Sequence, residues 1–464
     1  MLQHRHLLVL TSLVAFVAFS NAAQSQSHFP DDAVIQALIE SRINEERAVG
    51  LVVGVMEADG STRVFAAGDA GPDAKPLGAE SVFEIGSITK VFTGIILADM
   101  VAKGEVALDD PVARYLPEAA VTMPTRAGRE ITLLDLATHR SALPRMPDNF
   151  TPADSSNPFA DYTVEQMYEF LSKHELQRDI GAEAEYSNLA VGLLGHTLAL
   201  VSAKSYEALV RERILEPLGM HKTGIELTDD MQLWLAKGHD VAGNVVSNWD
   251  FRTLAAAGAL RSDVTDMLKF IAANTGPANG ALEEAMRASH AVQNAMGGNT
   301  SIGLNWIITS AGEARIIWHN GGTGGYRAFA GFDPDKGVGV VVLNNSNQNA
   351  DDIGMHLINP GLPLAEAPPP RVERNEIELP ADVLQRYVGT YPLSPEFIIT
   401  ISVQDGGLWA QATAQPKFPI FPESETEFFF KVVDAQISFD VDDDGVAQGL
   451  VLHQGGADMP ARKQ

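Results

Sequence analysis

A helix-like pattern of apolar residues follows Gly86. Apolar side chains recur there at intervals of one, three and four residues, at Ile88, Val91, Phe92, Ile95, Ile96 and Leu97. This spacing predicts a buried helix that begins near Ser87. Similar patterns predict an amphipathic helix over residues 32–46 and further helices over residues 131–138 and 255–273.

Shorter apolar runs predict strands at both ends of this region. Residues 51–56 and 62–67 flank the turn sequence Ala58-Asp59-Gly60-Ser61 and are expected to form a hairpin. Four further runs predict strands, over residues 302–309, 314–319, 326–332 and 338–343. Strands at both ends with helices between them predict one sheet whose strands come from distant parts of the chain.

A proline-rich segment separates this region from a different pattern. Residues 359–380 contain Pro360, Pro363 and the run Pro368-Pro369-Pro370, which predicts a stiff linker. Beyond the linker, apolar residues alternate with their neighbours, at Phe397, Ile399, Ile401, Val403, Ile437, Phe439 and Val441. We expect residues 30–358 to form the main domain and residues 381–464 to form a small β-barrel or sandwich domain.

The composition is typical of a soluble globular protein with two or three domains. The chain has 464 residues, of which 45% are hydrophobic and 20% are charged. Its 33 basic and 60 acidic side chains give a net charge of −27, which argues against nucleic acid and anionic membrane surfaces as partners. No cysteine is present, so disulfides, thiol catalysis and thiolate metal sites are excluded.

The start of the chain has the features of an export signal. A short basic region, His4-Arg5-His6, precedes an apolar run over residues 7–19, and Ser20-Asn21-Ala22 supplies the small residues of a cleavage site. We therefore expect a signal peptide over residues 1–23 and a periplasmic or secreted protein without stable membrane insertion. No cysteine follows the signal, which excludes a lipid-anchored lipoprotein. An uncleaved membrane anchor is the alternative.

Ser87 and Lys90 are the first candidates for chemistry. Side chains three residues apart lie on the same face of a helix, so a helix that begins near Ser87 brings Lys90 beside it. The helix N-terminus adds partial positive charge and free backbone N–H groups. An activated serine nucleophile needs an amine to take its proton and donors for the developing oxyanion. The alternative is that Ser87 caps the helix and Lys90 is solvated.

Tyr186-Ser187-Asn188 contains the second pair of candidates. The reference pKa of a phenol is about 10, and a nearby ammonium group would lower it. Beside Lys90, Tyr186 is expected to take the Ser87 proton and return it to a leaving group. Asn188 can hydrogen-bond a substrate amide and the lysine together. The alternative is a tyrosine ring that packs in the core.

The third candidate stretch ends a predicted strand and reads Trp318-His319-Asn320-Gly321-Gly322-Thr323-Gly324-Gly325. Glycines allow another backbone to approach an edge strand closely, as a substrate paired along that strand must do, so Gly321 and Gly322 are expected to bind substrate. A backbone N–H at the end of this stretch can face the Ser87 N–H across an oxyanion. His319 is expected to contact a substrate carboxylate or to relay a proton. The alternative is a glycine-rich turn with a structural histidine.

In order and spacing, these three stretches resemble the motifs of the serine β-lactamase and penicillin-binding-protein superfamily. The motifs are Ser87-x-x-Lys90, Tyr186-x-Asn188 and His319-x-Gly321. The branch that they resemble is the class C β-lactamase-like serine hydrolases, which include D-alanyl-D-alanine carboxypeptidases, D-aminopeptidases and esterases. Other segments share the resemblance, namely residues 138–144, 257–260 and 303–306.

The resemblance implies both a fold and a reaction. The implied fold is an α/β, β-lactamase/transpeptidase-like fold: a mainly antiparallel sheet flanked by helices, with an all-helical subdomain and a small C-terminal all-β domain that is similar to a lipocalin-like appendage. In the implied reaction Ser87 would be acylated, and Lys90 and Tyr186 would move protons. The Ser87 and Gly322 N–H groups would form the oxyanion hole.

Two departures from the family pattern bear on the substrate. Ala142 stands where glycine is usual, and His319 stands where class C β-lactamases carry lysine. Because histidine is commoner among the peptidase and esterase members, we expect an exported serine hydrolase that acts on esters or on D-configured amide or peptide bonds. The alternatives are a class C-type β-lactamase and a penicillin-binding or sensory module without turnover.

Other classes of hydrolase lack their motifs in this chain. Neither His-Glu-x-x-His nor Gly-x-Ser-x-Gly occurs, which argues against a metallohydrolase and an α/β-hydrolase. We therefore expect no metal and no other cofactor, and a small-molecule ester, peptide or β-lactam as the substrate. The sequence does not determine the oligomeric state.

Overall fold

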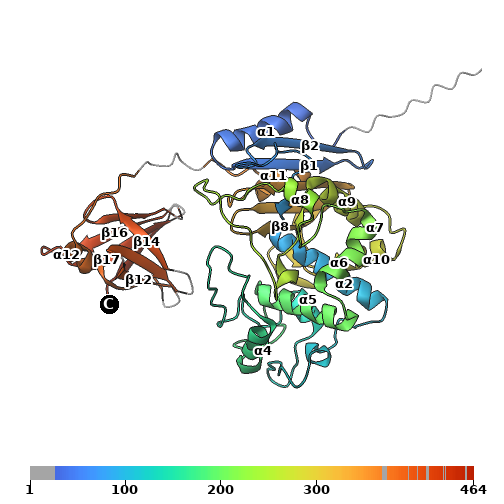
Figure 1. Cartoon of the computed structure of the whole chain (residues 1–464), viewed down its shortest axis with the longest axis horizontal. Coiled ribbons are helices and arrows are strands. Elements are labelled where there is room, and N and C mark those ends of the chain that lie inside the picture. Colours follow the sequence, from blue (N-terminus) through green and yellow to red (C-terminus); the bar gives the residue numbers. More distant parts are fainter. Residues whose placement is uncertain are drawn as a thin grey trace, which may run out of the picture.

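The computed structural model describes residues 27–367 and 374–464, apart from 395–396, 405, 414–416, 432, 434 and 455–456. The predicted signal peptide and the run Pro368-Pro369-Pro370 lie outside these residues. The described part of the chain has no helix long and apolar enough to cross a membrane. Its strands form two eight-stranded sheets and one two-stranded sheet (Figure 1).

The first sheet is antiparallel and has the strand order β2-β1-β10-β9-β8-β7-β6-β5. Its strands are β1 Gly50–Met56, β2 Thr62–Gly68, β5 Asn294–Gly297, β6 Thr300–Ile302, β7 Ile307–Ala311, β8 Ala314–Gly322, β9 Arg327–Asp333 and β10 Val338–Asn344. Val53 of β1 lies opposite Val342 of β10, so strands from the two ends of the domain are neighbours. The predicted hairpin and the predicted sheet of distant strands are therefore confirmed.

Helices cover both faces of this sheet. On one face, α1 Asp32–Asn44 and α11 Asp351–Ile358 bury Ile35 and Ile353 against the strands. On the other face, α9 Val264–Thr275 packs on β1 and β10. Every residue of β1 and β10 is buried as a result. Continuous apolar runs are what a strand covered on both faces requires.

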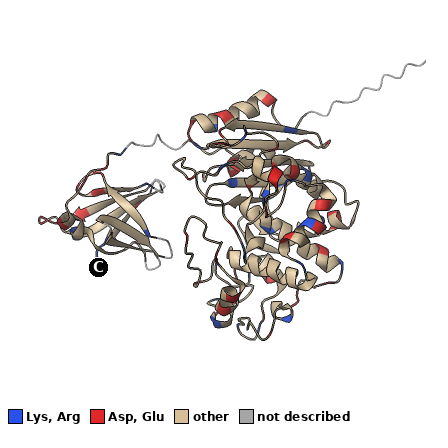
Figure 2. Cartoon of the chain, viewed as in Figure 1, with Lys and Arg blue, Asp and Glu red and all other residues tan. Residues whose placement is uncertain are grey.

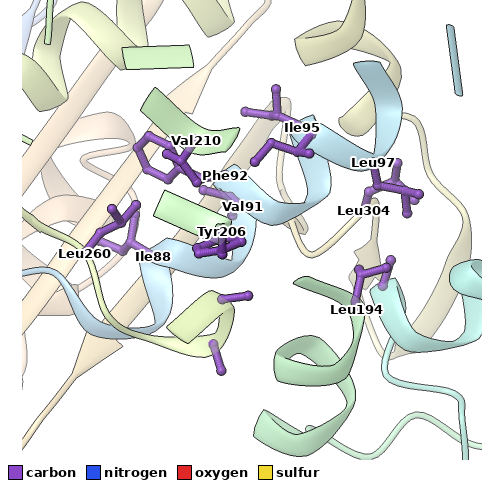
Figure 3. Close-up of a cluster of buried hydrophobic side chains, with 14 of the residues drawn as sticks. Ile88, Val91, Phe92, Ile95, Leu97, Leu194, Tyr206, Val210, Leu260 and Leu304 are labelled. Atoms are coloured by element: carbon purple, nitrogen blue, oxygen red, sulfur yellow. The ribbon is translucent and has the colours of Figure 1, made fainter. Parts of the chain in front are cut away.

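The remaining helices form the helical part of the main domain, with η1 Gly86–Ile88 and α2 Thr89–Ala102 at its centre. Figure 3 shows Ile88, Phe92 and Ile95 of this segment among buried side chains of other elements. The other elements are η2 Val112–Tyr115, α3 Leu133–Ala137, α4 Val164–Lys173, α5 Asn188–Ser202, α6 Tyr206–Val210, η3 Arg211–Leu215, α7 Glu216–Leu218, α8 Asp229–Leu233, η4 Ala255–Ala257 and α10 Ala281–Ser289. The buried helix predicted to begin near Ser87 is confirmed.

Two predicted elements are interrupted in the structure. The single strand predicted over residues 302–309 is wrong, because Asn305 has a left-handed backbone (φ 64°) and breaks the run between β6 and β7. The single helix predicted over residues 255–273 is also wrong. Its first part forms η4 and then β4 Arg261–Ser262, which pairs with β3 Phe83–Glu84. In both cases tertiary contacts, and not the local apolar pattern, determine the backbone conformation.

The C-terminal residues form the expected all-β domain, whose strands follow one another in chain order. They are β11 Gly389–Pro392, β12 Ile398–Gln404, β13 Gly407–Ala412, β14 Lys417–Pro422, β15 Glu427–Phe430, β16 Ala435–Val441, β17 Ala447–Gln454 and β18 Ala457–Arg462, preceded by α12 Ala381–Leu384 and η5 Gln385–Tyr387. The Gln464 N–H donates to the Thr390 carbonyl at 2.9 Å, which joins the last residues to the first strand. Aromatic rings fill the interior, where Tyr387 and Phe428 both contact Phe439.

We expect the C-terminal region to fold without the main domain, because it buries a separate hydrophobic core of its own. A chain limited to residues 374–464 should give a β-type circular dichroism spectrum and a cooperative thermal transition. Domains of this size are marginally stable, so a low melting temperature is expected. A random-coil spectrum would show that the region depends on the rest of the chain.

Candidate active site

Ser87 lies where a one-turn 3₁₀ helix, η1, passes directly into α2. From Ser81 to Met100 every residue is buried except Ser87, which is partly exposed. Gly86 precedes it with a left-handed backbone (φ 51°), a conformation that favours glycine. The sequence therefore places one accessible hydroxyl group at the start of an otherwise buried helix.

Lys90 lies one turn further along and is fully buried. Its Nζ is 2.9 Å from Ser87 Oγ and also donates to the Ala257 carbonyl at 2.6 Å. Burial lowers the pKa of Lys90 well below its usual 10.5, and the positive charge of Arg145 lowers it further. The pair predicted from the sequence is thus in contact, and its amine favours the neutral form that can accept a proton.

Tyr186 lies just before α5, and its ring is close to Lys90. Lys90 Nζ is 4.8 Å from the centroid of the Tyr186 ring. Burial raises the pKa of Tyr186 to about 12, although the Ser87 hydroxyl and the charge of Arg145 act in the opposite direction. The expectation that an ammonium group lowers this pKa is therefore wrong. Burial outweighs the charges, and Tyr186 keeps its proton at neutral pH.

Asn188 is the first residue of α5 and is partly buried. Its side-chain amide donates to Met146 Sδ at 3.8 Å, and its backbone N–H donates to the Arg145 carbonyl at 3.0 Å. Among the described residues no hydrogen bond joins Asn188 to Lys90. The structure thus joins Asn188 by hydrogen bonds to the loop at residues 145–146.

The end of β8 packs against the backbone around Ser87. A Cβ atom at Gly321 would lie 1.9 Å from the Ile85 carbonyl oxygen and 3.0 Å from the Ser87 nitrogen. A Cβ atom at Gly86 would lie 2.6 Å from the Gly322 nitrogen. Only glycine permits these approaches. They bring the Gly322 backbone beside that of Ser87, where the sequence predicted two oxyanion donors.

His319 is buried on β8, with its ring centroid 6.2 Å from that of Tyr186. Its Nδ1 lies 2.5 Å from the Asn320 carbonyl oxygen. Burial lowers the pKa of His319 to about 3, and the charge of Lys90 contributes. At neutral pH this side chain is therefore an uncharged imidazole.

His139 and Arg145 also lie at this site, and the sequence interpretation gave neither of them a role. The His139 ring contacts the Tyr186 ring at 4.5 Å between centroids, and its Nδ1 accepts a hydrogen bond from the Ser187 N–H at 3.2 Å. Burial holds the pKa of His139 well below its usual 6.5. For His139, the signal in the sequence is the resemblance of residues 138–144 to the family pattern.

The backbone of this segment explains one departure from the family pattern. His139 and Ala142 both have left-handed backbones, with φ angles of 57° and 63°. Glycine adopts that conformation without strain, which accounts for glycine as the usual residue where Ala142 stands. The resulting turn directs His139 toward Tyr186.

The arrangement has the parts that acyl transfer requires. A hydroxyl group is in contact with a neutral amine, a protonated phenol is close by, and two backbone segments meet beside the hydroxyl. The described residues contain no cluster of three or more His, Asp or Glu side chains that could hold a metal ion.

Two family models match the chain. Residues 35–358 match the model of the β-lactamase family, and residues 373–463 match a domain of unknown function, DUF3471.

Curated relatives agree with the first of these matches. The chain is 33% identical over 318 residues to the D-alanyl-D-alanine-carboxypeptidase/endopeptidase AmpH of Escherichia coli strain K12, an alignment that covers 64% of this chain and 79% of that protein. It is 27% identical over 350 residues to a β-lactamase of Pseudomonas fluorescens, with coverage of 68% and 93%.

Solved structures show the same fold. A class C β-lactamase superposes with a TM-score of 0.62 at 22% identity, covering 72% of this chain and 97% of the other. The class C β-lactamase from Rhodobacter sphaeroides superposes with a TM-score of 0.59 at 26% identity, covering 68% and 95%. The family match spans more than half of the chain, and the structure brings Ser87 and Lys90 into contact. This chain belongs to the β-lactamase family and is a serine hydrolase of the β-lactamase type.

Proposed function

We propose that this protein is an exported hydrolase in which Ser87 forms an acyl-enzyme with esters or with D-configured amide or peptide bonds. The observation that carries the proposal is the contact of 2.9 Å between Ser87 Oγ and the amine of Lys90, a lysine whose burial favours its neutral form. The proposed export rests on residues 1–23 of the sequence alone.

In the first half of the reaction, Ser87 Oγ attacks the carbonyl carbon of the substrate and its proton moves to Lys90 Nζ. The oxyanion of the tetrahedral intermediate accepts hydrogen bonds from the Ser87 and Gly322 N–H groups. Tyr186 donates its proton to the leaving group, and the ammonium of Lys90 restores that proton. The bond between carbonyl carbon and leaving group breaks, which leaves the acyl group on Ser87.

In the second half, water attacks the acyl-enzyme. The neutral Lys90 amine takes a proton from the water through Tyr186, and the same N–H groups hold the oxyanion. Collapse of the intermediate breaks the ester bond to Ser87, and Ser87 Oγ regains its proton from Lys90. The proton balance closes with the enzyme in its starting form.

A β-lactamase is the second candidate, because one of the reported relatives and both of the solved structures carry that name. His319 argues for a neutral ester substrate instead. Its imidazole is neutral at neutral pH and offers no permanent charge to the carboxylate of a β-lactam. The relative named as a D-alanyl-D-alanine-carboxypeptidase/endopeptidase supports a peptide substrate. An acylated protein without turnover is the third possibility.

Replacing the nucleophile tests the mechanism directly. Ser87→Ala should lower kcat/KM for a p-nitrophenyl ester by at least about 10³-fold, while the melting temperature stays close to that of the wild type. Lys90→Arg should be equally inactive, because a guanidinium group cannot accept the serine proton. Ser61→Ala, in the exposed β1–β2 turn, is the matched control and should keep full activity. Wild-type activity in pure Ser87→Ala protein would exclude Ser87 as the nucleophile.

The acidity of Lys90 sets the pH dependence. Because burial lowers the pKa of Lys90, the amine stays neutral until the pH falls through that lowered value and then becomes protonated and inactive. The log of kcat/KM for a neutral ester should therefore fall on the acidic side and reach a plateau well below pH 10.5. The pKa of Tyr186 is raised to about 12, so loss of its proton should cause no decrease in kcat/KM below pH 10.5. A rate that still rises up to pH 10.5 would mean an ordinary lysine.

The His319 position decides between the two enzyme hypotheses. At pH 8 the wild type should hydrolyse a short p-nitrophenyl ester more efficiently than nitrocefin, because the carboxylate of nitrocefin would meet an uncharged imidazole at position 319 on β8. His319→Lys should shift the ratio of the two kcat/KM values toward nitrocefin by about tenfold or more. His319→Gln, which adds no charge, is the control. A wild type that prefers nitrocefin, with a ratio unchanged in His319→Lys, would contradict the ester or peptide assignment.

A further inference from the structure

Arg145 is a permanent cation at the edge of a site whose other basic groups are neutral. Its side chain is exposed, and its guanidinium carbon is 5.0 Å from the centroid of the Tyr186 ring. The nearby Lys90, His139 and His319 are all buried, and burial favours the uncharged form of each. Arginine keeps its charge at any physiological pH.

This guanidinium has no anionic partner. Within the part of the chain that the structure describes, the side chain of Arg145 forms no ion pair and no hydrogen bond. The contrast with Arg178 is informative, because Arg178 comes from a neighbouring segment and forms an ion pair with Glu185. The protein is strongly acidic, and its Asp and Glu residues are spread over many elements (Figure 2). The charge of Arg145 is therefore available to a ligand.

The charges that act on the site are also of one sign. Every charged group that shifts the pKa of Lys90, His139 or Tyr186 is basic, and Arg145 is among them in all three cases. Of these basic groups only Arg145 is exposed, so it is the one whose charge faces an incoming substrate. A positive charge at a reaction site attracts anions.

We propose that Arg145 is a specificity-determining residue that binds a substrate carboxylate reaching the loop at residue 145, so that an ester with a carboxylate in this position is preferred to the matched neutral ester. The inference rests on the proposed acyl-enzyme function and adds the substrate class. Arg145 belongs to the loop after residues 138–144, whereas His319 belongs to β8. The two side chains therefore approach the substrate from different elements, and a carboxylate held by Arg145 does not need a charge at position 319.

Arg145 is held in this position by its surroundings. Its carbonyl accepts the Asn188 N–H at 3.0 Å, which ties the loop to the start of α5. Its guanidinium lies over the Tyr186 ring, an arrangement that orients an arginine while leaving its N–H groups available. A guanidinium with free N–H groups can bind a carboxylate through two parallel hydrogen bonds.

The test compares two pairs of esters that differ only by a carboxylate. The acyl pair is mono-4-nitrophenyl glutarate and 4-nitrophenyl butyrate, and the leaving-group pair is 3-acetoxybenzoate and phenyl acetate. The wild type should prefer the charged member of at least one pair in kcat/KM, mainly through a lower KM. Arg145→Gln should reduce that preference by about three- to tenfold, because an exposed ion pair is worth only a modest factor.

Two controls separate charge recognition from a structural effect. Arg145→Lys retains the charge and should keep part of the preference, and rising salt should weaken the preference in the wild type but not in Arg145→Gln. Arg315→Gln is the matched control, because it removes a positive charge from an exposed position at the start of β8, whereas Gly321 and Gly322 end that strand. It should leave the preference unchanged.

The outcomes distinguish this inference from the proposed function. Equal hydrolysis of both members in both pairs, or a preference that survives in Arg145→Gln, would overturn the role of Arg145 while leaving Ser87 as the nucleophile. If none of the four esters is hydrolysed, the result counts against the ester function, and the inference about Arg145 falls with it.

Discussion

The site depends on the burial of one amine. Lys90 is enclosed by the core around α2, where its Nζ bonds to the Ala257 carbonyl and to Ser87 Oγ. Water cannot stabilise an ammonium group there, and no carboxylate bonds to it anywhere in the described chain, so the neutral form prevails. The core that fixes the helix therefore also keeps the lysine uncharged, so that its amine can accept the Ser87 proton.

The same burial makes the whole reaction centre nearly neutral before substrate binds. His139 and His319 lose their protons more easily for the same reason, and Tyr186 keeps its proton more firmly. Charge then develops only on the reacting atoms, where fixed N–H groups can meet it. A neutral, preorganised centre with one cation at its edge separates two tasks: catalysis in the interior and selection at the surface.

The parts of this picture that follow local rules could be predicted from the sequence. The helix after Gly86 and the contact of Ser87 with Lys90 follow from helical spacing, and the sheet of distant strands follows from the order of apolar runs. The predictions that failed concern features that depend on tertiary structure. The acidity of Tyr186 is set by surroundings that no spacing reveals, and the turn that holds His139 and leads to Arg145 contains the left-handed backbones of His139 and Ala142. The break at Asn305 has the same origin.

The contact between Gly86 and the glycines that end β8 has a consequence for when the site forms during folding. The two backbone segments that meet at Ser87 are far apart in the chain, and no short-range element can bring them together. Contacts of this kind form late in folding, after the entropy of closing a long loop has been overcome. Until these segments meet, Ser87 lacks its second proposed oxyanion donor, so a partly folded chain is expected to be inactive.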